Sequence, residues 1–277
     1  MTAQNVNPEV GSEIDVDGIR TNYHDLGTGA PVLLIHGSGP GVSAWANWRL
    51  TLPVLAERNR VVAPDIVGFG YTERPSGIVY DRHTWERHIL GFMDALGIEK
   101  ASIVGNSFGG GMGMSLAVSH PDRVDKLVLM GSSALRFEIT PALDEIWGMQ
   151  PSIEAMRRAL DLFAWDRGLV TDELAEVRHR AFARADVAEA YAAMFPAPRQ
   201  RWIDALASDP ADVARIPHRT LVIHGREDQV VPVSASYEIF DLVPDAQLHV
   251  FGQCGHWTQI EYAETFSRIV ADFVASP

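Results

Sequence analysis

The chain of 277 residues has the composition of an ordinary globular protein, 47% hydrophobic and 21% charged, with a formal net charge of −13. This negative charge argues against a nucleic-acid partner, and it means that an anionic substrate would need cations placed locally in its site. The single cysteine, Cys254, excludes a disulfide within the chain. Because the sequence shows neither a signal-peptide pattern nor an apolar run of about 18 residues, we expect a cytoplasmic protein with no membrane partner.

Short apolar runs rich in Val, Leu and Ile recur along the chain, and each of them ends in turn residues. Such runs, without polar alternation, are typical of strands buried on both faces of a parallel sheet. Helical patterns lie between them, for example over residues 85–96 and 110–118. The alternation predicts an α/β fold with a doubly wound, mostly parallel sheet. The predicted strands cover residues 32–35, 61–63, 102–104, 126–130, 221–223 and 248–251.

The alternation of strands and helices is interrupted between residues 136 and 208, where the pattern is helical throughout. Helix start signals occur at Thr140, Ser152 and Thr171. An all-helical insertion between two parts of an α/β sheet predicts a lid over the ends of the strands. We therefore expect a core made of residues 1–135 and 209–277, with a helical lid over residues 136–208.

The segment Gly105-Asn106-Ser107-Phe108-Gly109 matches the G-x-S-x-G nucleophile elbow of the α/β-hydrolase fold. It follows a predicted strand and precedes a predicted helix, which is the context that this motif requires. A serine at so sharp a turn takes a strained backbone, and only small residues two places on either side leave room for it. The motif predicts that Ser107 is a nucleophile, while the alternative is a glycine turn of purely structural importance.

A serine hydroxyl is a weak nucleophile unless a base with its own orienting partner activates it. In this fold the partners follow in the order acid, then histidine. Asp228 comes directly after a predicted strand and His256 follows the last strand, so we expect Ser107, Asp228 and His256 to form a catalytic triad. Glu227 competes with Asp228 as the acid, and Cys254 is a weak alternative to Ser107 as the nucleophile.

The segment His36-Gly37-Ser38-Gly39-Pro40-Gly41 predicts a loop that presents backbone N–H groups to an oxyanion. We expect Ser38 and Phe108, the residue after the nucleophile, to form the oxyanion hole, and His36 to be structural. The chain contains no phosphate-binding loop, no dinucleotide fingerprint and no zinc-binding pair of histidines, so we expect neither a cofactor nor a metal.

These motifs together resemble the meta-cleavage product hydrolases. The combination of the HGSGPG loop, an asparagine before the nucleophile and the segment Gly255-His256-Trp257 is more specific than any motif alone, and the resemblance covers nearly the whole chain. It implies hydrolysis of a carbon–carbon bond in 2-hydroxy-6-oxo-hexa-2,4-dienoates that carry a substituent at carbon 6. The products would be 2-hydroxypenta-2,4-dienoate and a carboxylic acid, formed during the degradation of aromatic compounds.

The resemblance also implies which residues bind the anionic dienoate. Arg178 matches the arginine that polarises the substrate, and it would supply the local cation that this acidic protein needs. An ordinary solvated charge is the alternative for Arg178, and packing is the alternative for Asn106 and Trp257. The residues implied at the polar end of the substrate are Gly37, Ser38, Asn47, Asn106, Arg178 and Trp257.

The resemblance is strongest to the branch acting on products from alkylbenzenes such as toluene and cumene. By position, the pocket for the carbon-6 substituent would contain Ser133, Leu143, Trp147 and Val230. A bulky Trp147 in that pocket favours a short alkyl group over a phenyl ring, whereas packing within the lid is the alternative for this side chain. The family is often oligomeric, so a homo-oligomer is compatible with the resemblance.

Two other functions are compatible with the same triad. A general carboxylesterase or haloperoxidase-like hydrolase would turn over simple aryl esters and would lack residues dedicated to binding a dienoate. A ligand-binding sensor built on a hydrolase scaffold would bind without turnover. Within the favoured function, the sequence is compatible with an acyl-enzyme on Ser107 and with a gem-diol route in which Ser107 acts as a base towards water.

Overall fold

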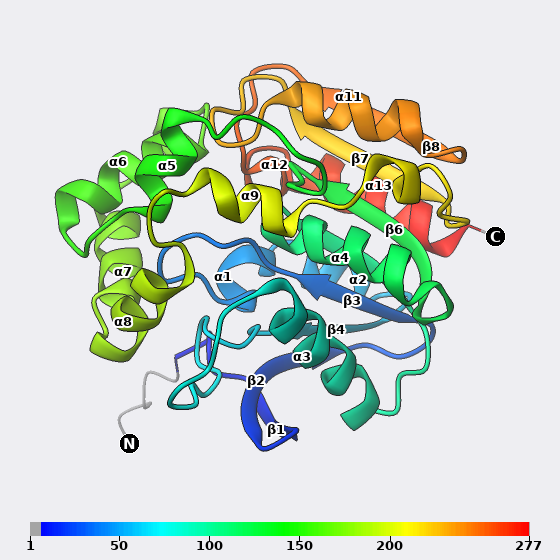
Figure 1. The fold of residues 1–277 in the computed structure, drawn as a ribbon, viewed down its shortest axis with the longest axis horizontal. Helices are drawn as coiled ribbons and strands as arrows, with labels where there is room; N and C mark the ends of the chain where they lie inside the picture. The colour runs from blue at the N-terminus through cyan, green and yellow to red at the C-terminus, as the bar shows by residue number, and fades with distance from the viewer. Residues whose placement is uncertain (1–6, 277) are drawn as a thin grey trace.

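A computed structural model describes residues 7–276, and its centre is an eight-stranded sheet with the strand order β1-β2-β4-β3-β5-β6-β7-β8 (Figure 1). The six strands from β3 to β8 run parallel, whereas β2 pairs antiparallel with both β1 and β4. The strands are β1 (Ser12–Val16), β2 (Ile19–Leu26), β3 (Pro31–Ile35), β4 (Arg60–Pro64), β5 (Ala101–Asn106), β6 (Val124–Met130), β7 (Thr220–Gly225) and β8 (Ala246–Phe251).

The six predicted strands are confirmed as β3 to β8, whereas β1 and β2 were not predicted from the sequence. The missed strands form an edge of the sheet, and many of their residues are polar and partly exposed. A search for apolar runs detects strands that are buried on both faces, so it does not detect an antiparallel edge of this kind.

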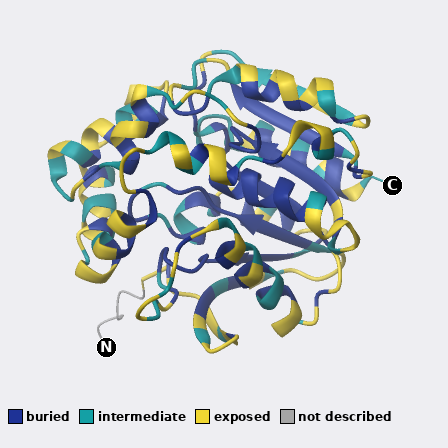
Figure 2. Ribbon diagram, in the orientation of Figure 1, coloured by how far each residue is buried: buried dark blue, intermediate teal, exposed yellow. Residues whose placement is uncertain are grey.

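Helices cover both faces of the sheet because alternate residues of each central strand point to opposite sides. In β3, Val32 and Leu34 pack in a cluster with residues of α1, α2 and α13, whereas Leu33 and Ile35 pack on the side of α3 and α4. Figure 2 shows the result, a buried sheet between helices whose outer faces are exposed. These helices, with α11 and α12, are α1 (Ala44–Trp48), α2 (Leu52–Leu55), α3 (Arg82–Ala95), α4 (Phe108–Ser119), α11 (Val233–Leu242), α12 (Thr258–Glu261) and α13 (Ala263–Ala275).

The segment between β6 and β7 is helical, and it lies in the left and central parts of Figure 1. The predicted helix starts are confirmed, because Thr140, Ser152 and Thr171 each accept a backbone N–H of the first helical turn through the side chain. The helices are α5 (Pro141–Trp147), α6 (Ile153–Phe163), α7 (Asp172–Phe182), α8 (Ala185–Met194), α9 (Gln200–Leu206) and the short α10 (Pro210–Val213).

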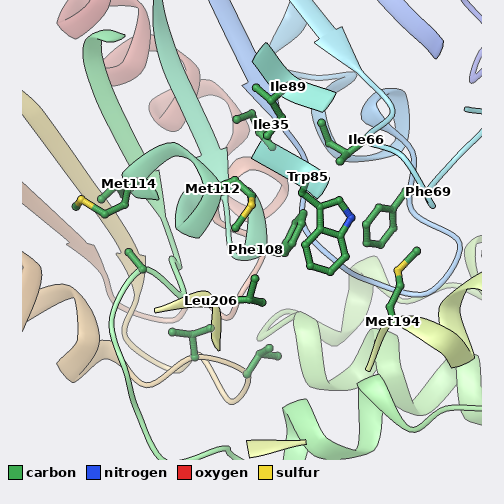
Figure 3. Close-up of a cluster of buried hydrophobic side chains, with 14 of the residues drawn as sticks. Ile35, Ile66, Phe69, Trp85, Ile89, Phe108, Met112, Met114, Met194 and Leu206 are labelled. Carbon is green, nitrogen blue, oxygen red and sulfur yellow. The ribbon is translucent and has the colours of Figure 1, made fainter. Parts of the chain in front are cut away.

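This insertion shares a hydrophobic core with the rest of the protein. Figure 3 shows Met194 of α8 and Leu206 of α9 in one cluster with Trp85 of α3 and Phe108 of α4. The shared cluster holds the insertion in a fixed position over the start of α4. Within residues 7–276, no helix combines the length and the apolar character needed to cross a membrane.

Two fully enclosed histidines stabilise the loops that follow β3 and β4. The Nε2 atom of His36 accepts the Ile66 N–H (3.0 Å), and Nδ1 of His88 accepts the Val67 N–H (3.3 Å). Because this nitrogen already accepts a backbone N–H, a second proton on either ring would point at another hydrogen-bond donor. The pKa of each imidazole is lowered from 6.5 to about 4, mainly by burial and, for His88, also by the neighbouring His36.

We expect these two histidines to contribute a fall in the free energy of unfolding as the pH is lowered from about 6.5 towards 4. Both histidines have a depressed pKa in the folded state, so the unfolded chain binds more protons in this range and gains stability relative to the native protein. Each histidine should account for about 3 kcal/mol at most, measured by urea unfolding at a series of pH values. The variant His88→Gln should show a shallower dependence, and an unchanged slope in this variant would argue against the assignment.

Candidate active site

Ser107 lies at the sharp turn between β5 and α4, as the nucleophile-elbow motif predicts. Its backbone has φ 53° and ψ −115°, an unfavourable conformation for a residue with a side chain. A Cβ atom on Gly105 would lie 2.3 Å from the Gly109 carbonyl oxygen, and one on Gly109 would lie 2.2 Å from that of Ile35. Only glycine therefore fits at positions 105 and 109. The turn places the Ser107 hydroxyl at the wall of a cavity.

Asp228 and His256 lie side by side after β7 and β8. The Nδ1 atom of His256 is 2.6 Å from Oδ2 of Asp228, while Oδ1 accepts the N–H groups of Val230 (2.7 Å) and Val231 (3.0 Å). Burial alone would raise the pKa of Asp228, but the charge of His256 and hydrogen bonds from His256 and His224 outweigh it and hold the pKa below its usual range. The carboxylate stays ionised and fixes the His256 tautomer that leaves Nε2 free to accept a proton.

Ser107 and His256 both line the same cavity, although the structure shows no hydrogen bond between them. Contacts between a nucleophile and its base are often long in ligand-free hydrolases and shorten when substrate binds. The backbone N–H of His256 donates to the Phe163 carbonyl (2.7 Å), so the end of α6 in the insertion fixes the loop that carries His256.

Glu227, the alternative acid, and Cys254, the alternative nucleophile, make different contacts in the structure. Glu227 accepts the backbone N–H of Cys254 (3.1 Å) and pairs with Arg226 at the surface, so it stabilises the loop rather than contacting His256. The Cys254 thiol is buried, and this burial together with Glu261 raises its pKa well above the usual range. A thiol that stays protonated is a poor nucleophile.

The loop after β3 lies opposite the first turn of α4, where the oxyanion hole was predicted. Phe108 is the first residue of α4, so its N–H has no acceptor within the helix and can donate to a ligand. Among the described residues, the Ser38 N–H likewise has no acceptor. The Gly37 N–H donates to Asn47 Oδ1 (3.2 Å), which fixes the shape of the loop.

The cavity beside Ser107 is about 1020 Å³ in volume with its open mouth included, and both polar and apolar side chains line it. We call its polar end the group Asn47, Arg49, Asn106, Arg178 and Gln259, in which the Gln259 amide donates to the Asn47 carbonyl. We call its apolar end the group made of Leu143 and Ile146 from α5, Met156 and Leu160 from α6, and Val230. Within residues 7–276, no group of three His, Cys, Asp or Glu side chains is arranged to hold a metal ion.

Arg178 lies at the cavity, but it is not a free cation. Its guanidinium pairs with Glu9 (Nη1 to Oε1, 2.9 Å) and donates a second hydrogen bond to the Gly41 carbonyl. The side chains of Arg178 and Glu9 are only 11% and 10% exposed, so the two charges neutralise each other in a poorly hydrated place. Trp257 also lies at the wall of the cavity, where its ring stacks on Phe163 (5.0 Å between centroids).

Two of the residues predicted in the substituent pocket, Trp147 and Ser133, do not line the cavity. The Trp147 ring stacks on Phe195 at 4.2 Å, and its Nε1–H donates to Ser38 Oγ (3.0 Å), so it supports the loop after β3. The Ser133 N–H donates to the Ser107 carbonyl, which places this residue under the elbow. Leu143 and Val230 do line the apolar end, as predicted.

Four residues of this site were not predicted from the sequence: the cavity-lining Arg49, Phe163 and Gln259, and Glu9, the partner of Arg178. Arg49 follows two residues after the predicted Asn47, and this proximity was the one available signal. Glu9 precedes the first strand by three residues and nothing in its surroundings indicates that it would meet α7.

Comparisons with known proteins agree with this geometry. The family described as alpha/beta hydrolase fold matches residues 30–263. A 2-hydroxymuconate semialdehyde hydrolase from Pseudomonas sp. (strain CF600) is 58% identical over 99% of this chain and 97% of its own length. A 2-hydroxy-6-oxo-2,4-heptadienoate hydrolase from Pseudomonas putida is 53% identical over 98% of this chain and 99% of its own length.

A solved structure resembles the chain equally closely. The meta-cleavage product hydrolase CumD from Pseudomonas fluorescens IP01 superposes with a TM-score of 0.95 at 57% identity, covering 96% of this chain and 98% of that one. The chain belongs to the meta-cleavage product hydrolases of the α/β-hydrolase family. It is therefore an enzyme that hydrolyses a carbon–carbon bond in the degradation of aromatic compounds.

Proposed function

We propose that this enzyme cleaves 2-hydroxy-6-oxo-hexa-2,4-dienoates that carry a small alkyl group at carbon 6, with Ser107, His256 and Asp228 as its catalytic triad. The observation that carries the proposal is the single cavity that joins the Ser107 elbow to one polar, cationic end and one aliphatic end. A dienoate with an alkyl substituent has the same division, with its carboxylate and 2-oxygen at one end and its alkyl group at the other.

Hydrolysis of a carbon–carbon bond demands more than an esterase site because carbon is a poor leaving group. The dienol must first become a keto form that is protonated at carbon 5, after which the fragment that contains carbons 1 to 5 can leave as a stabilised dienolate. Asn106 and Arg178 at the polar end are placed to bind the oxygens whose charge changes in this step. Fixed donors of this kind stabilise developing charge more than water does.

The second step is attack on the carbonyl at carbon 6. Either the Ser107 oxygen or a water molecule adds to this carbon while Nε2 of His256 takes the proton. The N–H groups of Ser38 and Phe108 stabilise the resulting oxyanion. The bond between carbons 5 and 6 then breaks, and its electron pair goes to carbon 5 and on through the conjugated system to the 2-oxygen, which releases 2-hydroxypenta-2,4-dienoate. Where water attacked, the carboxylic acid forms in the same step; where Ser107 attacked, a water molecule activated by His256 then hydrolyses the acyl-enzyme and releases the acid.

The preference for a small substituent rests on the apolar end of the cavity and on the relatives. Branched side chains of Leu143, Ile146 and Val230 line that end. Because Trp147 packs outside the cavity, these aliphatic residues rather than its indole ring set the available space. Three Pseudomonas relatives above 50% identity are named for substrates with hydrogen or methyl at carbon 6.

The test is the decay of the dienolate absorbance with purified enzyme on 6-methyl, 6-isopropyl and 6-phenyl substrates. We expect kcat/KM to be at least tenfold higher for the two alkyl substrates than for the phenyl one, because extra ring atoms must displace packed side chains. Equal rates on all three would remove the alkyl preference. Absence of decay together with rapid turnover of aryl esters would favour a general carboxylesterase, and binding without any turnover would favour a sensor.

A further inference from the structure

The polar end of the cavity contains a second arginine, Arg49, whose charge is not neutralised by a partner. Arg49 ends α1 and donates from Nη1 to the Ala46 carbonyl (2.8 Å). Among the described residues, no carboxylate lies within 4 Å of its guanidinium, in contrast to Arg178 with its partner Glu9. Arg49 is thus the cation at this end that a ligand carboxylate can pair with directly.

The three charged groups at this end influence one another. Burial lowers the pKa of Arg49, the charge of Arg178 lowers it further and that of Glu9 raises it. A guanidinium stays charged at neutral pH in spite of such shifts. One carboxylate and two guanidinium groups leave one net positive charge, which a monocarboxylate would balance.

Polar atoms without partners lie in the same part of the wall. The Nδ2 atom of Asn47 and the Oε1 atom of Gln259 are buried and make no hydrogen bond with the described residues, and the two residues are 7% and 1% exposed. Buried polar groups without partners cost stability, so their presence beside a cavity indicates that a bound polar molecule completes their hydrogen bonds. The Gln259 amide also donates to the Asn47 carbonyl (3.4 Å), which holds the two residues together.

We infer that Arg49 binds the carboxylate of the substrate, while Arg178, held in place by Glu9, acts on the neighbouring 2-oxygen. This inference rests on the proposed function for the identity of the substrate. It assigns affinity for the anionic end mainly to Arg49, because a pair that is already neutralised attracts a further anion less than a free guanidinium does.

The test compares Arg49→Gln and Arg49→Lys with the parent enzyme on the 6-methyl dienoate and on the neutral ester p-nitrophenyl acetate. We expect Arg49→Gln to raise KM for the dienoate at least tenfold, while KM for the ester changes less than twofold. Arg49→Lys should give an intermediate KM, because it keeps the charge and loses the fork of donors. The matched control is Arg58→Gln, which removes the same charge from an exposed arginine outside the cavity.

A second measurement separates this inference from the proposed function. Inhibition of p-nitrophenyl acetate hydrolysis by 2-oxopentanoate probes the anion site whether or not dienoates are cleaved. Arg49→Gln should raise the inhibition constant at least fivefold, whereas Arg58→Gln should leave it unchanged. If both Arg49 variants keep the KM for the dienoate and this inhibition constant within twofold of the parent values, the inference is wrong. Absence of dienoate cleavage by the parent enzyme would instead contradict the proposed function.

Discussion

Replacing Ser107 with alanine should lower the steady-state kcat on the 6-methyl dienoate by roughly 10⁴-fold or more. The elbow holds the Ser107 backbone at a positive φ and presents its oxygen to the cavity, so the substitution removes one oxygen atom. The polar end of the cavity is untouched, and the variant should therefore still bind the dienolate. Binding is measured by titrating the variant with substrate and following the shift of the dienolate absorbance.

A matched control is Ser132→Ala. Ser132 is a buried serine close to the same helix, and its hydroxyl has no hydrogen-bond partner among the described residues. This variant should keep activity within about threefold of the parent enzyme, because it removes a hydroxyl that does not face the reaction. If Ser107→Ala retained near-parent turnover, or if both variants lost activity equally, Ser107 would not be the nucleophile or base.

The central part of the fold could be predicted because its signals are local. A strand buried on both faces must be apolar at consecutive positions, and a helix start needs a side chain such as that of Thr140 to accept a backbone N–H. The elbow was predictable for the same reason, because Gly105 and Gly109 lie two residues from Ser107. The edge strands β1 and β2 carry no such signal, because polar residues interrupt both sequences, SEIDV and IRTNYHDL.

The polar end of the site could not be predicted in the same way. Glu9 meets Arg178 across 169 positions of sequence, and no local pattern encodes which carboxylate reaches which guanidinium. Trp147 was expected in the substituent pocket because of its position in the family resemblance. The structure instead gives its N–H a hydrogen-bond partner, Ser38, and its ring a stacking partner, Phe195. Both errors concern side-chain direction, which depends on the packing of distant segments.

Replacing Asp228 with asparagine should lower kcat by roughly 10⁴-fold with little change in the fold. The Oδ1 atom of Asp228 accepts two backbone N–H groups, those of Val230 and Val231, while Oδ2 faces His256. The asparagine would keep its oxygen on the two N–H groups and turn its amide NH₂ towards His256. The ring would then have to accept at Nδ1 and carry its proton on Nε2, where it can no longer remove a proton from Ser107 or water.

The matched control is Glu227→Gln, which removes a carboxylate one residue away. Glu227 supports the loop through the Cys254 N–H, an interaction that a glutamine oxygen can also accept. We therefore expect kcat for this variant within about threefold of the parent value, with at most a small loss of thermal stability. Measuring kcat for the two variants side by side decides which carboxylate orients the base. A large loss of kcat in Glu227→Gln with a small loss in Asp228→Asn would identify Glu227 as the residue that orients His256. The residue that fixes the His256 tautomer is the one whose replacement lowers kcat without affecting the fold.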